Sequence, residues 1–200
     1  MMSTTADLIK QLRELTGAGV MDCRDALLAA GNDLEKATAL LREKGLAAAS
    51  ERADRETRNG VLDLYSHGDG RVGVMVEVNC ETDFVGRTKE FRVFAHEVAL
   101  QVAAASPRWV RAEDIPAEVV EEERGKSRQM ALAEGKPERV VDQIVAGRLE
   151  KFVTENCLLK QPYIRDETRT LNDLLQEIIA TTGENVAVRR FVRWAVGEDS

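Results

Sequence analysis

The sequence predicts an α+β fold, in which a helical bundle precedes a small, largely antiparallel sheet covered by helices. The first 45 residues show only the three- and four-residue spacing of helices. Apolar residues with a period of two, typical of strands, recur at 61–65, 71–78 and 186–196. Helical patterns occupy most of the remaining chain. These observations predict a three-helix bundle at 1–45, a helical linker at 46–59 and an α+β core domain at 60–200.

The composition of the chain is that of a soluble globular protein, with 44% hydrophobic and 32% charged residues among 200. The net charge of −7 argues against a protein that coats nucleic acid, because phosphate binding requires a concentrated basic surface. The three cysteines lie far apart without a C-x-x-C pair, and no secretory pattern begins the chain. A reducing cytoplasm is therefore expected. No apolar run reaches the roughly 18–20 residues that span a bilayer, so no membrane association is expected.

Three short amphipathic patterns at 8–15, 20–30 and 34–41 predict the helices of the bundle. Gly17 and Gly19 interrupt the chain before the second helix, and Gly45 is expected to end the third. Such a bundle is marginal by itself because it is small. Residues 46–59 lack a broad apolar face, which indicates an exposed helical connector.

A β-hairpin is predicted next, since the strand patterns at 61–65 and 71–78 flank residues 67–70 (HGDG), which tolerate positive φ. A single helix running to about Ala105 is expected after the second strand. Thr82 is a good N-cap for it, and Asp83 would lie in its first turn, where the helix dipole favours a carboxylate. Phe84 falls outside the apolar spacing of this helix. Two interpretations stay open: it projects from the helix tip, or it folds back into the core.

The second half of the chain predicts three more helices and two more strands. Pro116 suits the first turn of a helix to about Ala133, whose acidic run 121–123 is interpreted as a solvated face. Pro137 begins a helix with a core-facing side. Residues 158–164 indicate a strand interrupted by proline.

The last helix is predicted between Thr170, as its cap, and Gly183. Its apolar spacing is regular, which favours a buried face. The final strand, at 186–196, carries three arginines that face either solvent or a partner.

No enzyme chemistry is indicated. Residues 125–127 (GKS) do not form a phosphate-binding loop, because Val120 stands where its first glycine belongs and no strand precedes it. His67 and His96 lack ligand-spaced neighbours, so no metal site is expected. Cys80 has no histidine at a fixed spacing and is interpreted as a small buried hydrophobe. No catalytic residue and no cofactor are assigned.

Two motifs carry a specific resemblance: residues 79–85 (NCETDFV) and residues 16–23 (TGAGVMDC). Shorter matches follow in the same order at 134–137, 161–164 and 189–191. With these motifs the chain resembles elongation factor Ts along nearly its whole length. The resemblance also implies that the N-terminal bundle is of the ubiquitin-associated type.

The resemblance implies a guanine nucleotide exchange factor for elongation factor Tu in translation elongation. It would bind the GDP form, disturb the Mg²⁺ and phosphate site, and promote GDP release so that GTP can bind. The residues that would displace Mg²⁺ in the partner are Thr82, Asp83, Phe84 and Val85. Those that would contact the partner's nucleotide-binding domain are Lys10, Arg13, Val20 and Met21, although on their own they are ordinary surface residues. Glu81 receives no role.

Only one core is present, which resembles a short form of the family, so two copies are expected to form a homodimer through the terminal strand. An alternative function is an adaptor that binds a ubiquitin-like partner through the N-terminal bundle. That alternative assigns no function to Thr82–Val85.

Overall fold

The structure is a computed structural model that describes residues 5–198; residues 1–4 of the predicted bundle and 199–200 of the predicted core domain lie outside this range. Its helices and small sheets confirm the α+β class. The described residues form two compact units. The first comprises the chain up to Leu62, Val78–Ala95 and Asp173–Ala187; the second comprises Asp63–Glu77, His96–Asn172 and the chain from Val188. The domain boundaries at 45 and 59 stay a prediction.

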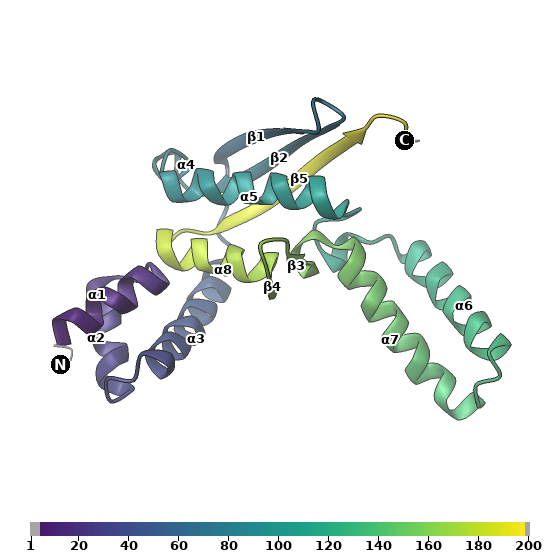
Figure 1. Cartoon of the computed structure of the whole chain (residues 1–200), viewed down its shortest axis with the longest axis horizontal. Coiled ribbons are helices and arrows are strands. Elements are labelled where there is room, and N and C mark those ends of the chain that lie inside the picture. Colours follow the sequence, from purple (N-terminus) through teal and green to yellow (C-terminus); the bar gives the residue numbers. More distant parts are fainter. Residues whose placement is uncertain (1–4, 199–200) are drawn as a thin grey trace. The chain divides into compact units, whose positions relative to one another are not determined.

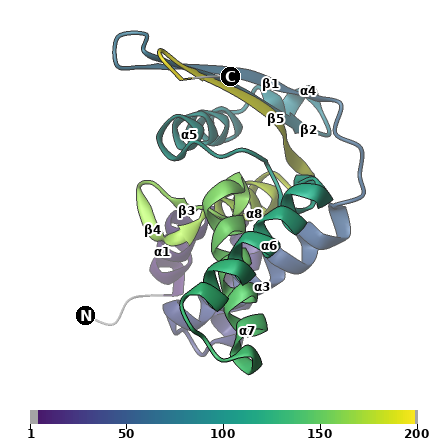
Figure 2. The same ribbon diagram turned by 90° about the vertical axis from the view of Figure 1, so that its right-hand side faces the viewer.

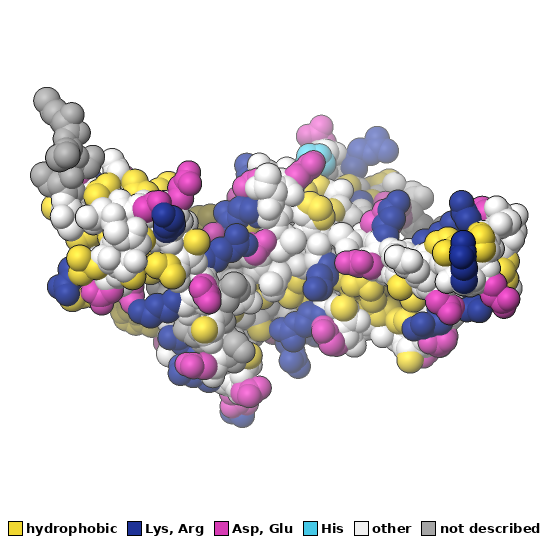
Figure 3. Space-filling view, turned by 90° about the horizontal axis from the view of Figure 1, so that it is seen from below, with side chains coloured by type: hydrophobic (Ala, Val, Ile, Leu, Met, Phe, Trp, Pro, Cys, Tyr) yellow, Lys and Arg dark blue, Asp and Glu magenta, His cyan; other side chains and the backbone are white. Residues whose placement is uncertain are grey.

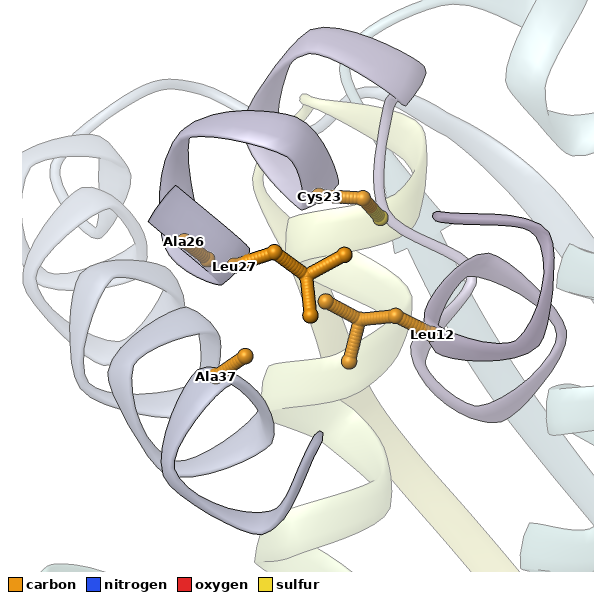
Figure 4. Packing of buried hydrophobic residues seen from close by; sticks show 5 residues of the cluster. All are labelled: Leu12, Cys23, Ala26, Leu27 and Ala37. Atoms are coloured by element: carbon orange, nitrogen blue, oxygen red, sulfur yellow. The ribbon is translucent and has the colours of Figure 1, made fainter. Parts of the chain in front are cut away.

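The three helices of the predicted N-terminal bundle are confirmed: α1 (Thr5–Thr16), α2 (Val20–Ala29) and α3 (Leu34–Arg52). Their apolar side chains meet in a small buried cluster that includes Leu12, Cys23 and Leu27 (Figure 4). Between α1 and α2 the chain turns at Gly17, whose φ of +67° is accessible to glycine at little cost.

The prediction that Gly45 ends the third helix is wrong, since α3 continues to Arg52. The glycine serves packing: a Cβ at Gly45 would lie 3.3 Å from the Cβ of Ala180 in α8 (Leu171–Thr182). The predicted linker is therefore helical only as far as Arg52. Residues 53–58 form a turn and a short stretch without regular secondary structure.

The main sheet has three strands in the order β1-β2-β5: β1 (Asn59–His67), β2 (Val72–Cys80) and β5 (Val186–Ala195). The predicted hairpin is confirmed, with positive φ at each of residues 68, 69 and 70. The Val196 N–H donates to the Arg71 carbonyl at 2.9 Å, which sets the end of β5 beside the start of β2. These two strands are thus antiparallel, as the sequence predicted.

The helix expected after β2 consists of two helices, α4 (Asp83–Gly86) and α5 (Lys89–Ala105). The break lies at Thr88, whose hydroxyl donates to the Val85 carbonyl at 2.8 Å and accepts the Phe91 N–H at 3.3 Å. Thr88 thereby caps α5 and sets α4 apart as a separate turn. The predicted apolar face of α5 is buried, at Phe91, Phe94, Ala95, Val98 and Val102.

In the second unit, α6 (Ala117–Ala133) and α7 (Glu138–Asn156) lie side by side as a helical hairpin (Figures 1 and 2). Both begin directly after the prolines that predicted them. Ala131, Val141 and Val145 form its buried cluster. The acidic run at 121–123 lies on the solvated side, where Glu121 and Glu122 are exposed.

The prediction of a strand at 158–164 is largely wrong. Leu158 and Leu159 are both buried, and two consecutive buried side chains fit a helical turn better than strand alternation. They lie in the 3₁₀ turn η2 (Leu158–Lys160); a second such turn is η1 (Ala112–Asp114). Only β3 (Pro162–Tyr163) is extended there, and it pairs antiparallel with β4 (Asp166–Thr170).

Helix α8 begins directly after Thr170 and ends at Gly183 as predicted. The glycine has a φ of +72°, and its N–H donates to the Ile179 carbonyl at 2.9 Å. Among the described helices, none combines the length and the hydropathy that a bilayer crossing requires.

Gly60 is the glycine whose replacement should cost most. Its φ is +147°, and an added Cβ would lie 2.1 Å from the backbone oxygen of Val78. We expect Gly60→Ala to lower the free energy of unfolding by about 2 kcal/mol or more, because backbone must move. Gly125→Ala is the control, since Gly125 lies in α6 with no neighbouring atom within 4 Å of its added Cβ. The free energy of unfolding of this control variant should rise by about 0.5–1 kcal/mol, because alanine favours a helix more than glycine does. Equal denaturant midpoints for the two variants would contradict this.

Candidate functional site

The four residues Thr82–Val85, here called the tip, present one large apolar side chain to solvent. Phe84 is 82% exposed, whereas Val85 beside it is buried. The interpretation of Phe84 as a core residue is therefore wrong, and the projecting one is confirmed. An exposed phenylalanine contributes little to the stability of the fold, so it is available to an apolar pocket of another molecule.

Thr82 caps α4 as the sequence predicted. Its backbone is extended, with φ −120° and ψ 154°, and its hydroxyl oxygen accepts the Val85 N–H at 3.4 Å. Asp83 lies in the first turn, and its carboxylate accepts a hydrogen bond from Arg87 at 2.7 Å. Both partners of that pair are exposed, so the pair orients the carboxylate but adds little stability.

The base of the tip is packed closely against the sheet. Gly86 is buried, and an added Cβ there would lie 3.5 Å from the Cys80 sulfur and 3.6 Å from Gly60. The Cys80 thiol donates to the Thr82 carbonyl at 3.1 Å. Burial, with a smaller effect from the negative charge of Glu184, raises the pKa of Cys80 to about 11. The thiol is therefore neutral near pH 7 and does not act as a nucleophile.

Contacts at the tip and directly before it come from residues that the sequence analysis did not select. Glu184, after α8, accepts both the backbone N–H of Thr82, at 3.0 Å, and its hydroxyl proton, at 2.6 Å. Glu81, which received no role, accepts the backbone N–H of Asn185 at 2.6 Å. These pairs are separated by more than 100 residues in sequence, and no local pattern could have identified them.

The predicted contact residues of the bundle lie on its outside. Lys10 and Arg13 are both exposed and, three residues apart on α1, share one face, whereas Leu12 is buried. Val20 and Met21, at the start of α2, are 50% and 57% exposed. Hydrophobic side chains are numerous on the face of the bundle that Figure 3 shows at its left end. Leu15 of α1 is also exposed, at 70%, although it belongs to the apolar pattern at 8–15 that predicted this helix.

From Asp173 onward, helix α8 belongs to the first compact unit together with the bundle and the tip, and it supports both. Arg42 of α3 pairs with Asp173 in the first turn of α8. Ala180, near the other end, faces Gly45. The residue that holds Thr82, Glu184, follows two residues after the helix ends. The two regions predicted to contact the partner therefore share one support.

The arginines of the terminal strand do not form one solvent-facing group. The Arg190 side chain is exposed and bonds Glu77 at 2.7 Å. Arg193 is mostly buried, and it donates to the Ala103 carbonyl at 3.4 Å and pairs with Glu198. Arg193 therefore contributes to packing and is not available to a partner, contrary to the prediction.

Comparison with known proteins gives a consistent result. Residues 29–198 match the family model described as Elongation factor TS. Elongation factor Ts of Caldanaerobacter subterraneus subsp. tengcongensis is 56% identical over 194 residues, 97% of either chain. That of Moorella thermoacetica is 55% identical over 98% of this chain and 97% of its own, and that of Coprothermobacter proteolyticus is 51% identical over 98% and 100%.

These matches extend over nearly the whole length of both partners in each comparison, so they define the class of this protein as a translation elongation factor. The chain belongs to the elongation factor Ts family. The family model covers the tip, whereas Lys10, Arg13, Val20 and Met21 precede its first matched residue.

Proposed function

We propose that this protein is a guanine nucleotide exchange factor for elongation factor Tu, and that it acts in the cytoplasm without an enzymatic step or a cofactor of its own. The observation that supports this most is the tip, where Phe84 is 82% exposed on a turn capped by Thr82. The same four residues are those that the family resemblance associates with Mg²⁺ displacement in the partner.

The physical basis of such exchange is a linked equilibrium. A protein that binds the nucleotide-free partner more tightly than the GDP form must lower the affinity for GDP by the same factor. No bond of the nucleotide is broken. The tip supplies the differential contact: Phe84 inserts as an apolar wedge into the partner, and Asp83 enters near its Mg²⁺. Thr82 and Val85 hold the turn in place. Since Mg²⁺ holds the phosphates, its displacement weakens GDP binding.

Phe84→Ala tests the wedge. GDP release from elongation factor Tu should slow by roughly thirtyfold, because truncating a hot-spot anchor typically costs about 2 kcal/mol or more. Stability should change by less than about 0.5 kcal/mol, since the side chain is exposed. The two measurements are a labelled-GDP release assay and a denaturant melt.

Leu132→Ala provides the control, since Leu132 is an exposed apolar residue of α6 away from the tip in sequence. With this variant, GDP release from elongation factor Tu should be as fast as with the unaltered chain. Normal release by a folded Phe84→Ala protein would refute the wedge. Tight binding of elongation factor Tu by both variants, without any stimulated release, would refute the exchange function itself.

The bundle is proposed to bind the partner's nucleotide-binding domain through Lys10, Arg13, Val20 and Met21. Deleting residues before Leu46 is a poor test of this, because it would cut α3 and remove the Arg42–Asp173 pair with α8. A surface substitution leaves the bundle intact.

Met21→Glu should weaken binding of elongation factor Tu by about tenfold or more, because it places a charge in an apolar contact. Met21 is exposed near the N-terminus of α2, where a carboxylate is tolerated, so the fold should persist. Leu40→Glu, on the exposed side of α3, is the matched control and should change the dissociation constant by less than about twofold. Equal losses in calorimetric titrations of both variants would exclude a contact centred on Met21.

A homodimer is proposed because the main sheet exposes an apolar groove of about 310 Å³. Leu64 of β1 and Val192 and Trp194 of β5 line it, and Trp194 is 70% exposed. Contiguous exposed apolar side chains on a sheet indicate an interface. A second copy would bury this groove against its own groove, in an isologous contact. The two cores together would then supply the contacts with elongation factor Tu that a single core lacks.

Light scattering at micromolar concentration should give the mass of two chains for the free protein. For the complex with elongation factor Tu it should give the mass of two chains of each protein. Trp194→Lys should convert the free protein to a monomer, since the substitution would bury a charge in the dimer contact. Met130→Lys makes the same change at an exposed position of α6 and should leave the dimer intact. A monomer mass for the unaltered chain would contradict the proposal.

A further inference from the structure

We propose that Glu184 and Glu81 are positioning residues that fix the orientation of the tip and thereby set the direction in which Phe84 projects. This inference rests on the proposed function of the tip and adds to it two residues outside Thr82–Val85. Neither carboxylate has to touch the partner for this role. Each acts through the backbone of the segment that it holds.

The tip requires such support because α4 has only four residues. One helical turn is unstable in isolation, since several dihedral angles must be fixed for one or two hydrogen bonds. The bond from the Gly86 N–H to the Thr82 carbonyl is long, at 3.4 Å, as is the capping bond from Val85. The orientation of α4 therefore depends on contacts from elsewhere in the unit.

Glu184 supplies the strongest of these contacts. Its two oxygens accept the N–H and the hydroxyl proton of Thr82 at 3.0 and 2.6 Å. With its proton committed to Glu184, the Thr82 hydroxyl presents a lone pair to the Val85 N–H, which is the capping bond. The carboxylate thus determines the hydroxyl orientation on which the cap depends.

Glu81 makes the reciprocal contact. It accepts the backbone N–H of Asn185 at 2.6 Å, so each of the two segments holds the backbone of the other through a glutamate. Two crossed contacts restrict rotation of the tip about either one. Glu81 also pairs with Arg55 at 3.5 Å.

Asn185 extends this arrangement to the chain that follows the bundle. Its buried side-chain amide donates to the carbonyls of Ala53 and Arg55 at 3.1 and 2.7 Å. The segment after α3, the turn after α8 and the tip are therefore joined by one continuous hydrogen-bonded group. All of its members belong to the first compact unit.

Glu184→Gln tests the role of Glu184 with almost no change in size. The two protons of Thr82 go to different oxygens of Glu184, and glutamine replaces one of these oxygens with an NH₂ donor, so the two bonds cannot both persist in this geometry. We expect the maximal rate of GDP release, at saturating concentrations of the variant, to fall by about three- to tenfold, the equivalent of one net hydrogen bond. Thr82→Val should give a similar loss, and the two changes together little more than either alone. Glu138→Gln removes one exposed charge at the start of α7 and should leave the rate unchanged.

The distinguishing measurement is Glu184→Gln in the Phe84→Ala background. If Glu184 acts by aiming Phe84, its substitution should change release there by less than about twofold. An equal loss in both backgrounds would mean that Glu184 acts by itself or through stability, and would overturn the inference. Unchanged release by Glu184→Gln, with slow release by Phe84→Ala, would overturn it while leaving the proposed wedge in place. Normal release by Phe84→Ala would remove the proposed wedge and the inference together.

Discussion

The two regions that are proposed to contact the partner depend on the turn that follows α8. Within a few residues, Gly183 ends the helix, Glu184 holds the backbone and hydroxyl of Thr82, and Asn185 holds the chain after α3. The helix before this turn packs on the bundle through the positions of Asp173 and Ala180. One helix and its terminal turn thus support both surfaces that are assigned to the partner.

The surroundings of the tip oppose ionisation of the cysteine beside it. The one thiol near the tip is kept neutral, since burial and the nearby Glu184 carboxylate raise its pKa to about 11. The carboxylate that adds to the effect of burial on Cys80 also accepts the protons of Thr82. The negative charge of Glu184 therefore helps to fix the geometry of the tip and also opposes ionisation of the Cys80 thiol.

Local sequence patterns were sufficient to predict most helices and strands, but not the contacts between residues distant in sequence that hold these elements together. Prolines before α6 and α7, the Thr82 cap and the glycines of the hairpin located their elements from sequence alone. Two failures arose where a distant contact decides: Gly45 packs against Ala180, and Leu158 and Leu159 are both buried. A third, the division of one expected helix into α4 and α5, is set locally by the hydroxyl of Thr88. Glu81 and Glu184 carried no signal at all, because their partners lie about 100 residues away.

The use of aromatic residues follows the same division between folding and binding. The chain has only nine aromatic residues: two Trp, two Tyr and five Phe. Phe91 and Phe94 are buried in α5, whereas Phe84 and Trp194 are largely exposed. Burying either of the exposed pair within the chain would have stabilised the fold by about 1.5–3 kcal/mol. That free energy remains available to a contact with another molecule, and aromatic anchors are the residues in which interface energy is concentrated.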